Sequence, residues 1–473
     1  MKDALLVTAN SSGAEVLPFI KVWGLLPGAL LITLIYSKLN NRMSRERVFY
    51  TMIGMFLLFF AIFTFVLYPM RDILHPHATA NYLESILPRG FKGIIAMFRY
   101  WTFSSFYIMS ELWSSTILSM LFWGFANDVT RLGEARRFYG LIAISFNLAA
   151  VVSGQVSIFL SGTYLKNHLH IVSNPWHQSV ILLTSLVMLS GLCILALYRY
   201  LTHHVLNALP DGGVREPPKR VKMSMKENFS YLFRSKYLLY IALIVLSYNV
   251  VINLVEVIWK DQVRNLNPDP SSYITYMSQI TSITGVISFL LSLLVSGQVI
   301  RRYGWTVGAM ITPIMFLITS IAFFFFFFGG GTLLGVLAIV GTSPLMLAAF
   351  FGSMQNCLSR AFKFTFFDAT KEMAFIPLDR ESKLKGKAVI DGVGSRLGKS
   401  TGSFIHQGLL MIFATIAASA HIVAVVVFGV ITVWILASIS LGKKFKELTA
   451  TEETTEPATI PSTTQPIPEE ALT

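Results

Sequence analysis

The chain contains 473 residues, of which 54% are hydrophobic and 13% are charged, and its mean hydropathy is +0.61. Apolar runs of roughly twenty residues recur along it, a pattern that is typical of polytopic helical membrane proteins and excludes a soluble enzyme. We attribute the net charge of +13 to cytoplasmic loops, so we expect no nucleic-acid partner.

The first sixteen residues, Met1 to Val16, contain several polar side chains and are predicted to form a loop. Beyond them, hydropathy and the length needed to cross a bilayer predict about eleven helical spans. They are placed at about 17–37, 50–69, 93–126, 138–163, 178–200, 236–258, 273–299, 304–328, 332–359, 386–413 and 418–441.

Most of the lysines and arginines between the spans lie on alternate loops, so the positive-inside rule places these loops and the C-terminus in the cytoplasm. Short motifs recur in the same order along the chain, among them Lys2-Asp3 and Lys260-Asp261, as expected of the paired halves of secondary transporters. The predicted division is an N-terminal helical half (1–200), a cytoplasmic linker (201–235), a C-terminal helical half (236–445) and a disordered cytoplasmic tail (446–473).

Seven charged residues fall inside the predicted spans, where a charge is costly unless it faces a cavity within the protein. Four cations and three anions predict a net positive, internally paired cavity that suits a polyanionic small molecule. Alternatively, the cations near span ends could extend to the membrane interface. The seven candidate substrate-binding residues are Lys21, Arg99, Glu111, Glu256, Asp391, Arg396 and Lys399.

The stretch from Lys385 to Gln407 is predicted to be a membrane helix that carries three of these charges. Its glycines recur every four residues, at 394, 398 and 402, which would let a neighbouring helix approach closely. Gly398-Lys399-Ser400 is not a phosphate-binding loop, because Val393 stands where that motif needs glycine. No ATP-hydrolysing pump is therefore expected.

Two local features accompany the predicted acidic site residues. Lys260 follows Glu256 by one helical turn and could pair with it. Aromatic residues surround Glu111 in the sequence and could stack on a planar ring, although core packing is the more common use of such side chains. The cysteines and histidines form no metal-ligand pattern, and no cofactor is expected.

Five long motifs stand out in the chain: SGAEVLPFIKVWG (12–24), IMSELWSSTILSMLFWGFAN (108–127), NLVEVIWKDQV (253–263), FTFFDATKEMAFIPLD (364–379) and KGKAVIDGVGSRLGKSTGS (385–403). Together they resemble the nucleotide transporter family of plastids and obligate intracellular bacteria, the ATP/ADP translocases.

The resemblance implies a twelve-helix fold similar to the major facilitator architecture, which exchanges host ATP for ADP and, in some members, phosphate or other nucleotides. It maps the family's important charges to Lys21, Glu111, Glu256 and Lys399. The family's first span normally precedes the motif that is here Lys2-Asp3. We therefore expect a further apolar segment upstream of Met1.

The leading hypothesis is a membrane antiporter, not an enzyme, that exchanges ATP for ADP by alternating access. The alternatives are a proton-coupled or broad-specificity nucleotide importer and a membrane enzyme that acts on a phosphorylated lipid. The enzyme would need a metal or an activated nucleophile, and neither is found among the membrane residues. The expected partners are nucleotides and the lipid bilayer, and the expected location is the inner membrane of an intracellular bacterium.

Overall fold

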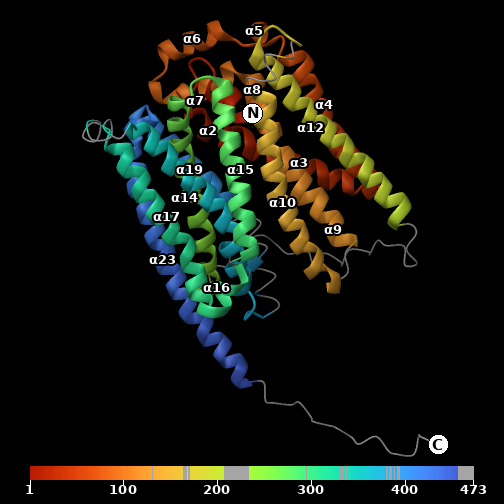
Figure 1. Ribbon diagram of the computed structural model, residues 1–473, viewed down its shortest axis with the longest axis vertical. Coiled ribbons are helices and arrows are strands. Elements are labelled where there is room, and N and C mark those ends of the chain that lie inside the picture. Colours follow the sequence, from red (N-terminus) through yellow and green to blue (C-terminus); the bar gives the residue numbers. More distant parts are fainter. Residues whose placement is uncertain are drawn as a thin grey trace, which may run out of the picture.

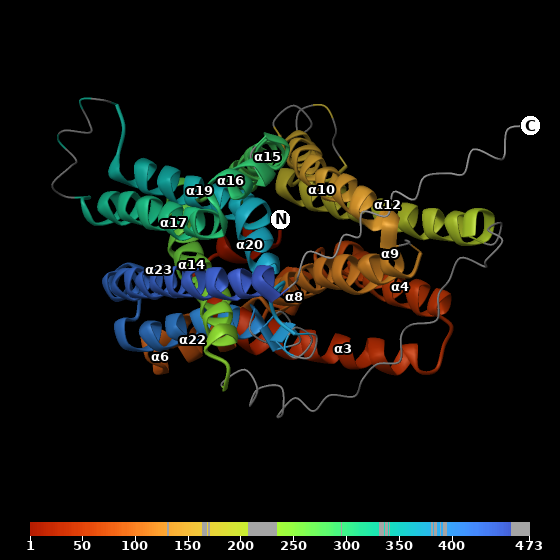
Figure 2. The same ribbon diagram turned by 90° about the horizontal axis from the view of Figure 1, so that it is seen from below.

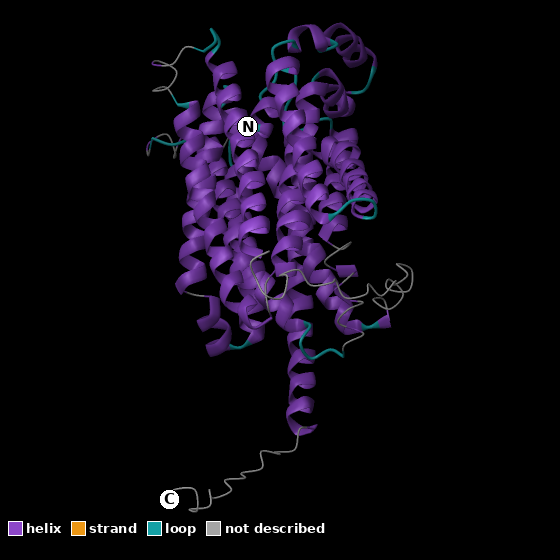
Figure 3. Ribbon diagram, turned by 90° about the vertical axis from the view of Figure 1, so that its right-hand side faces the viewer, coloured by secondary structure: helices purple, strands orange, loops and turns teal. Residues whose placement is uncertain are grey.

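The computed structural model of the protein is a helical bundle, and its described residues contain no strand (Figure 3). The long helices run between two ends of the molecule at which most of the connecting segments lie. The structure describes Met1 to Thr455 except for residues 130–131, 163–167, 169–170, 207–233, 295, 331–334, 336–338, 340, 380–381, 383–385, 388 and 391–394.

The helices before residue 207 include several short π-helical or 3₁₀ turns, labelled η. They are α1 (Lys2–Val7), α2 (Val16–Phe19), η1 (Ile20–Leu25), α3 (Leu26–Asn40), α4 (Arg45–Ile62), η2 (Phe63–Leu67), α5 (Arg71–Leu74), α6 (His77–Ile86), η3 (Arg89–Phe91), α7 (Lys92–Arg99), α8 (Trp101–Ser115), η4 (Thr116–Phe122), α9 (Trp123–Val129), α10 (Leu132–Ser161), α12 (Pro175–Tyr200) and η5 (Leu201–Leu206).

The helices after residue 233 lie on the other side of the bundle in two views (Figures 1 and 2). They are α14 (Lys236–Leu266), α15 (Pro270–Leu294), α16 (Ser296–Tyr303), α17 (Trp305–Phe328), α19 (Pro344–Phe362), η6 (Lys363–Phe367), α20 (Asp368–Ala374), α22 (Ser395–Phe413) and α23 (Ile416–Thr455).

Eight segments of the described residues are long and apolar enough to cross a membrane. Each of them coincides with one of the eleven predicted spans, which confirms a polytopic helical membrane protein. They are Val16–Asn40, Arg45–Leu67, Ile144–Ser161, Pro175–His204, Lys236–Leu266, Pro270–Leu293, Trp305–Phe328 and Ile416–Thr449.

The remaining three predicted spans differ from the helices that the structure describes. The segment 93–126 is not one span, because the backbone leaves the helical region at Tyr100 (φ −107°, ψ 48°), between α7 and α8. The Ser104 hydroxyl donates to the Met97 carbonyl (3.0 Å) and so satisfies a group that the break would leave unpaired. In the segments 332–359 and 386–413, the structure describes the long helices α19 from Pro344 and α22 from Ser395, and several earlier residues of both segments lie outside the described residues.

Two predictions about the ends of the chain need correction. The stretch from Met1 to Val16 is not simply a loop, because α1 is a helix whose last four residues are buried apolar side chains. The polar residues of that stretch reduced its average hydropathy and concealed this short helix. At the other end, α23 continues to Thr455, so residues 446–455 are helical rather than disordered. The rest of the predicted tail and most of the predicted linker lie outside the described residues.

The two sides of the bundle meet along α10 and α15, which pack closely over much of their length. A Cβ added at Gly154 would lie 2.1 Å from Ser282 Oγ, so only glycine permits this approach. The hydroxyl of Ser278 donates to Ser157 (2.8 Å) in the same seam. Small and hydroxyl-bearing residues therefore hold the two sides together within the membrane.

Candidate functional site

A chain of ion pairs joins the two sides of the bundle. Lys21 Nζ lies 2.9 Å from Glu256 Oε2 and donates to Asn253 Oδ1 at 2.7 Å. Glu256 Oε1 lies 2.9 Å from Lys260 Nζ, which also contacts Asp3 Oδ1 at 3.0 Å. Each oxygen of one carboxylate thus holds a different lysine. We call these four charged residues, Lys21, Glu256, Lys260 and Asp3, the central ion network.

Lys260 is the most buried charge of the central ion network, with only 3% of its surface exposed. A buried ammonium is tolerated only when carboxylates and hydrogen bonds compensate for its lost hydration. Asp3 reaches it from α1 and Glu256 from one turn earlier on α14. The predicted pairing of Glu256 with Lys260 is therefore confirmed, and Asp3 completes it from the other side of the bundle.

A second ion pair lies beside this network and anchors the start of the chain. Lys2 Nζ is bonded to Glu111 Oε1 of α8 and also lies 5.1 Å from the centre of the Tyr107 ring. Because Lys2 and Asp3 are consecutive, α1 carries one ammonium to Glu111 and one carboxylate to Lys260. The predicted residues Glu111 and Glu256 are thereby linked through two neighbouring residues of α1.

The backbone around Lys21 departs from α-helical geometry. Lys21 lies in the π-helical turn η1, and its carbonyl accepts from the N–H of Leu26, five residues later. Pro27 follows at the start of α3 and has no N–H of its own, which favours such a local irregularity. π-helical turns are frequent at functional sites because they redirect individual side chains. The turn places Lys21 toward Glu256 rather than toward the lipid.

Lys399 lies on α22 with an exposed side chain, and no ion pair is recorded for it among the described residues. The charges of Glu111, Lys21 and Lys363 act on it, so it lies near the central ion network. Its neighbour Gly398 explains how α22 reaches this position. A Cβ there would lie 2.6 Å from the Asn249 Cβ of α14, which confirms that glycine permits close helix packing.

The structure does not bring Arg99 to the central ion network. Its side chain is 4% exposed and pairs with Glu84 of α6 at 2.8 Å, within the short helices that cover one end of the bundle. The sequence located this charge in an apolar window but could not show which residue it faces. Asp391 and the side chain of Arg396 lie outside the part of the chain that the structure describes.

Sequence reasoning missed Lys2, Asp3 and Lys260 as site residues, because hydropathy assigned them to loops. One signal was present: Lys2-Asp3 and Lys260-Asp261 repeat the same dipeptide in corresponding places. Such repeats are expected of the paired halves of secondary transporters.

The end of the bundle that holds these residues is further closed by contacts to α22. Trp23 Nε1 donates to Gln407 Oε1 (3.2 Å), and Gln407 Nε2 donates to the Pro18 carbonyl (2.9 Å). In η3, a Cβ at Gly90 would lie 2.6 Å from Met411 Cα, so this turn rests directly on the α22 backbone. Elements far apart in the sequence therefore seal this end around the ion pairs.

Comparison with known proteins identifies the family of the chain. Residues 1–445 match the model of the TLC ATP/ADP transporter family. The chain is 45% identical to ADP,ATP carrier protein 1 of Chlamydia trachomatis serovar D, an alignment that covers 96% of this chain and 86% of that protein.

It is also 39% identical to the chloroplastic ADP,ATP carrier protein 2 of Arabidopsis thaliana, over 96% of this chain and 72% of that protein. The residues matched by the family model include the positions of all four charges of the central ion network. A polytopic helical membrane bundle agrees with those matches. The chain belongs to the TLC ATP/ADP transporter family.

Proposed function

We propose that this protein is an antiporter that exchanges ATP for ADP across its membrane by alternating access, with no covalent bond made or broken. The observation that carries this proposal is the central ion network, in which Lys21 of one side is held by Glu256 of the other at 2.9 Å. The ADP,ATP carriers that are 45% and 39% identical to the chain over the aligned residues support the choice of substrate.

Lysines are well suited to this substrate because the ammonium group binds phosphate oxygens as a point charge and can change partners. Lys399 has an exposed side chain and lies near Glu111 and Lys21. A nucleotide whose phosphates bind Lys399 and Lys21 would compete with Glu256 for Lys21. Binding would then weaken a bond between the two sides, which is how a ligand shifts a protein between two conformations.

The proposed orientation places the C-terminus in the cytoplasm and the protein in the inner membrane of an intracellular bacterium. The basic residues Lys443, Lys444 and Lys446 near the end of the long helix α23 support a cytoplasmic C-terminus. The resemblance to carriers of Chlamydia supports the bacterial membrane.

The experiment is uptake of labelled ATP into proteoliposomes that contain the full chain and are loaded with ADP or left empty. If the protein is an antiporter, labelled ATP is taken up rapidly only by the vesicles that contain ADP. Equal uptake into empty vesicles would contradict antiport. Abolition of uptake by a protonophore would instead favour proton-coupled import. Measurements with GTP, UTP and CTP distinguish an adenine nucleotide carrier from a broad-specificity importer.

A further inference from the structure

Lys363 lies in the π-helical turn η6, which follows α19 on the C-terminal side of the bundle (α14 to α23). Its carbonyl accepts from the N–H of Asp368, five residues later, so the turn sets the two residues beside each other. The Lys363 ammonium lies 2.9 Å from Asp368 Oδ2, and 35% and 32% of the two side chains are exposed. Lys21 likewise lies in a π-helical turn and pairs with a carboxylate. Lys363 therefore has, on the C-terminal side, the same kind of setting as Lys21.

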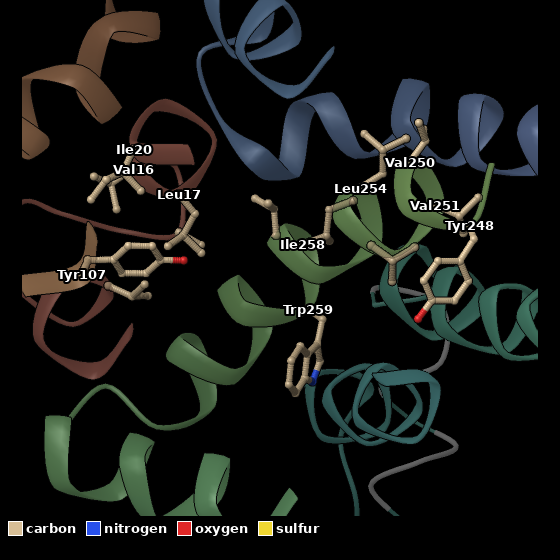
Figure 4. Close-up of a cluster of buried hydrophobic side chains, with 14 of the residues drawn as sticks. Val16, Leu17, Ile20, Tyr107, Tyr248, Val250, Val251, Leu254, Ile258 and Trp259 are labelled. Atoms are coloured by element: carbon tan, nitrogen blue, oxygen red, sulfur yellow. The ribbon is translucent and has the colours of Figure 1, made fainter. Parts of the chain in front are cut away.

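The contacts between α19 and α14 show at which level of the bundle Lys363 lies. The Trp259 indole donates to Ser353 Oγ (2.9 Å). The Tyr248 hydroxyl donates to the Ser359 carbonyl (3.4 Å), so the two helices are antiparallel. Figure 4 shows both rings extending from α14 toward neighbouring helices. The Ser359 carbonyl also accepts from the N–H of Lys363, one turn later. Lys363 thus lies beyond the level of Tyr248, on the side away from the central ion network.

The contacts between α22 and α14 place Lys399 between the levels of the other two lysines. It follows Gly398, where a Cβ would lie 2.6 Å from Asn249 Cβ. Asn253, one turn further along α14, accepts from Lys21. The charges of both other lysines act on Lys399, so the three lie within electrostatic range. We call Lys21, Lys399 and Lys363 the lysine row.

The lysine row concentrates positive charge along one stretch of the bundle. Ammonium groups repel one another, and the repulsion is stronger where little water screens it. Glu256 offsets the charge of Lys21 at 2.9 Å. Asp368 offsets the charge of Lys363 at the same distance. A polyphosphate carries several anionic oxygens along one chain, so it can replace carboxylates at more than one lysine. The ammonium group suits such an exchange because it binds oxygens as a point charge.

We propose that Lys363 is a third phosphate-binding lysine of the transport pathway and that Asp368 holds it while no nucleotide is bound. The phosphates of an entering nucleotide take the place of the Asp368 carboxylate, as they take the place of Glu256 at Lys21. Asp368 is then a competitor of the substrate rather than a support for Lys363. This assignment rests on the nucleotide exchange proposed above, and it extends the phosphate site away from the central ion network.

The test measures equilibrium binding of labelled ATP to the purified full-length chain in detergent, where both ends of the bundle are accessible. Lys363→Gln should raise the dissociation constant of ATP by about tenfold or more, as expected for loss of a hydrogen bond to a charged group. Competition by inorganic tripolyphosphate, which offers phosphates alone, should weaken by as much. Asp368→Asn removes the competing carboxylate. It should lower the dissociation constant of ATP by about threefold, in keeping with the modest strength of a partly exposed ion pair.

The opposite signs of these two effects distinguish competition from structural support. If the pair only stabilised η6, both variants would weaken ATP binding or neither would change it, and either result overturns the proposal. Lys387→Gln and Glu372→Gln are the matched controls, because these two residues also form a lysine–carboxylate pair on the C-terminal side. Both controls should bind ATP as the wild type does. Equal shifts in the controls would assign the effects to net charge and would also overturn the proposal.

If Lys363→Gln fails to insert, Asp368→Asn decides alone, since unchanged or weaker ATP binding by that variant contradicts competition. ATP/ADP exchange by the wild type is measured in proteoliposomes alongside. Absence of exchange by the wild type would refute the proposed function itself. Normal exchange, together with unaltered dissociation constants in both variants, refutes only the role of Lys363.

Discussion

Lys21 and Glu256 are separated by 235 positions in the chain, yet their charged atoms lie 2.9 Å apart at the junction of the two sides of the bundle. Burial of either charge without its partner would cost much free energy, because an unpaired charge in an apolar environment is strongly unfavourable. The pair therefore joins the two sides while remaining breakable by a competing anion. This relationship links the stability of the closed end to the proposed binding of phosphates.

Lys399→Ala should reduce ATP/ADP exchange by about thirtyfold or more, since removal of one partner of a hydrogen-bonded charge pair typically costs about 2–5 kcal/mol. Membrane insertion should remain normal, because the Lys399 side chain is exposed. Uptake and the amount of protein in the membrane are measured together. Lys443→Ala, an exposed lysine near the end of α23, is the control. Normal exchange by the Lys399 variant would show that this lysine serves only packing.

Lys260→Gln should destabilise the protein by about 3–5 kcal/mol, because it leaves two largely buried carboxylates without their shared cation. The double variant Asp3→Asn/Lys260→Gln should be less destabilised than the sum of the two single variants, since Asp3 Oδ1 lies 3.0 Å from the lysine. Thermal unfolding of the purified wild type, the two single variants and the double variant gives the four stabilities that are compared. If the destabilisations of the two single variants simply add in the double variant, the two residues do not interact in solution. Lys38→Gln, at an exposed position, serves as the control.

Gly154→Val should impair both assembly and exchange, because the added atoms would overlap Ser282 Oγ, which lies 2.1 Å from the position of a Cβ, and the Ser278 backbone. The closely packed seam between α10 and α15 would have to separate. Gly429→Val, where a Cβ meets nothing within 4 Å, should be tolerated. Size-exclusion profiles and exchange rates of the two variants provide the comparison. Equal behaviour of both would argue against a tight seam.

The stability of the short helices at the closed end should depend on pH through His75. Burial lowers the pKa of His75 to about 4 from its ordinary 6.5, and its Nε2 lies 2.6 Å from Thr102 Oγ1. The unfolded chain binds this proton between those two values and the folded chain does not, so stability is full above pH 6.5 and decreases as the pH falls toward 4. The loss should not exceed about 3 kcal/mol.

Thermal unfolding between pH 7 and pH 4.5 measures this dependence. His75→Asn should flatten the profile, because the buried group that resists protonation is gone. His204→Gln, at an exposed position, should leave the profile of the wild type unchanged. A steep profile that persists in His75→Asn would assign the pH dependence to other residues.

Hydropathy and residue counting were sufficient for the class of fold and for three of the charges that form ion pairs inside the bundle. The cost of a charge in an apolar span depends on local composition alone, and it singled out Lys21, Glu111 and Glu256, which the structure places in ion pairs. The pairing of Glu256 with Lys260 was also predictable, because both lie on one helix and helical periodicity sets their separation. Local rules suffice wherever both partners belong to the same element.

Only the tertiary structure decided which distant charges meet. Arg99 occupies an apolar stretch like Lys21, but α7 turns its side chain to Glu84, so the same sequence signal led to a different partner. Conversely, Lys2 and Asp3 lie in a polar stretch that hydropathy rejects, and α1 carries them to Glu111 and Lys260 across 109 and 257 positions. Partners so far apart are determined by how whole helices pack, and packing depends on the shapes of all the contacting side chains rather than on the composition of any one segment.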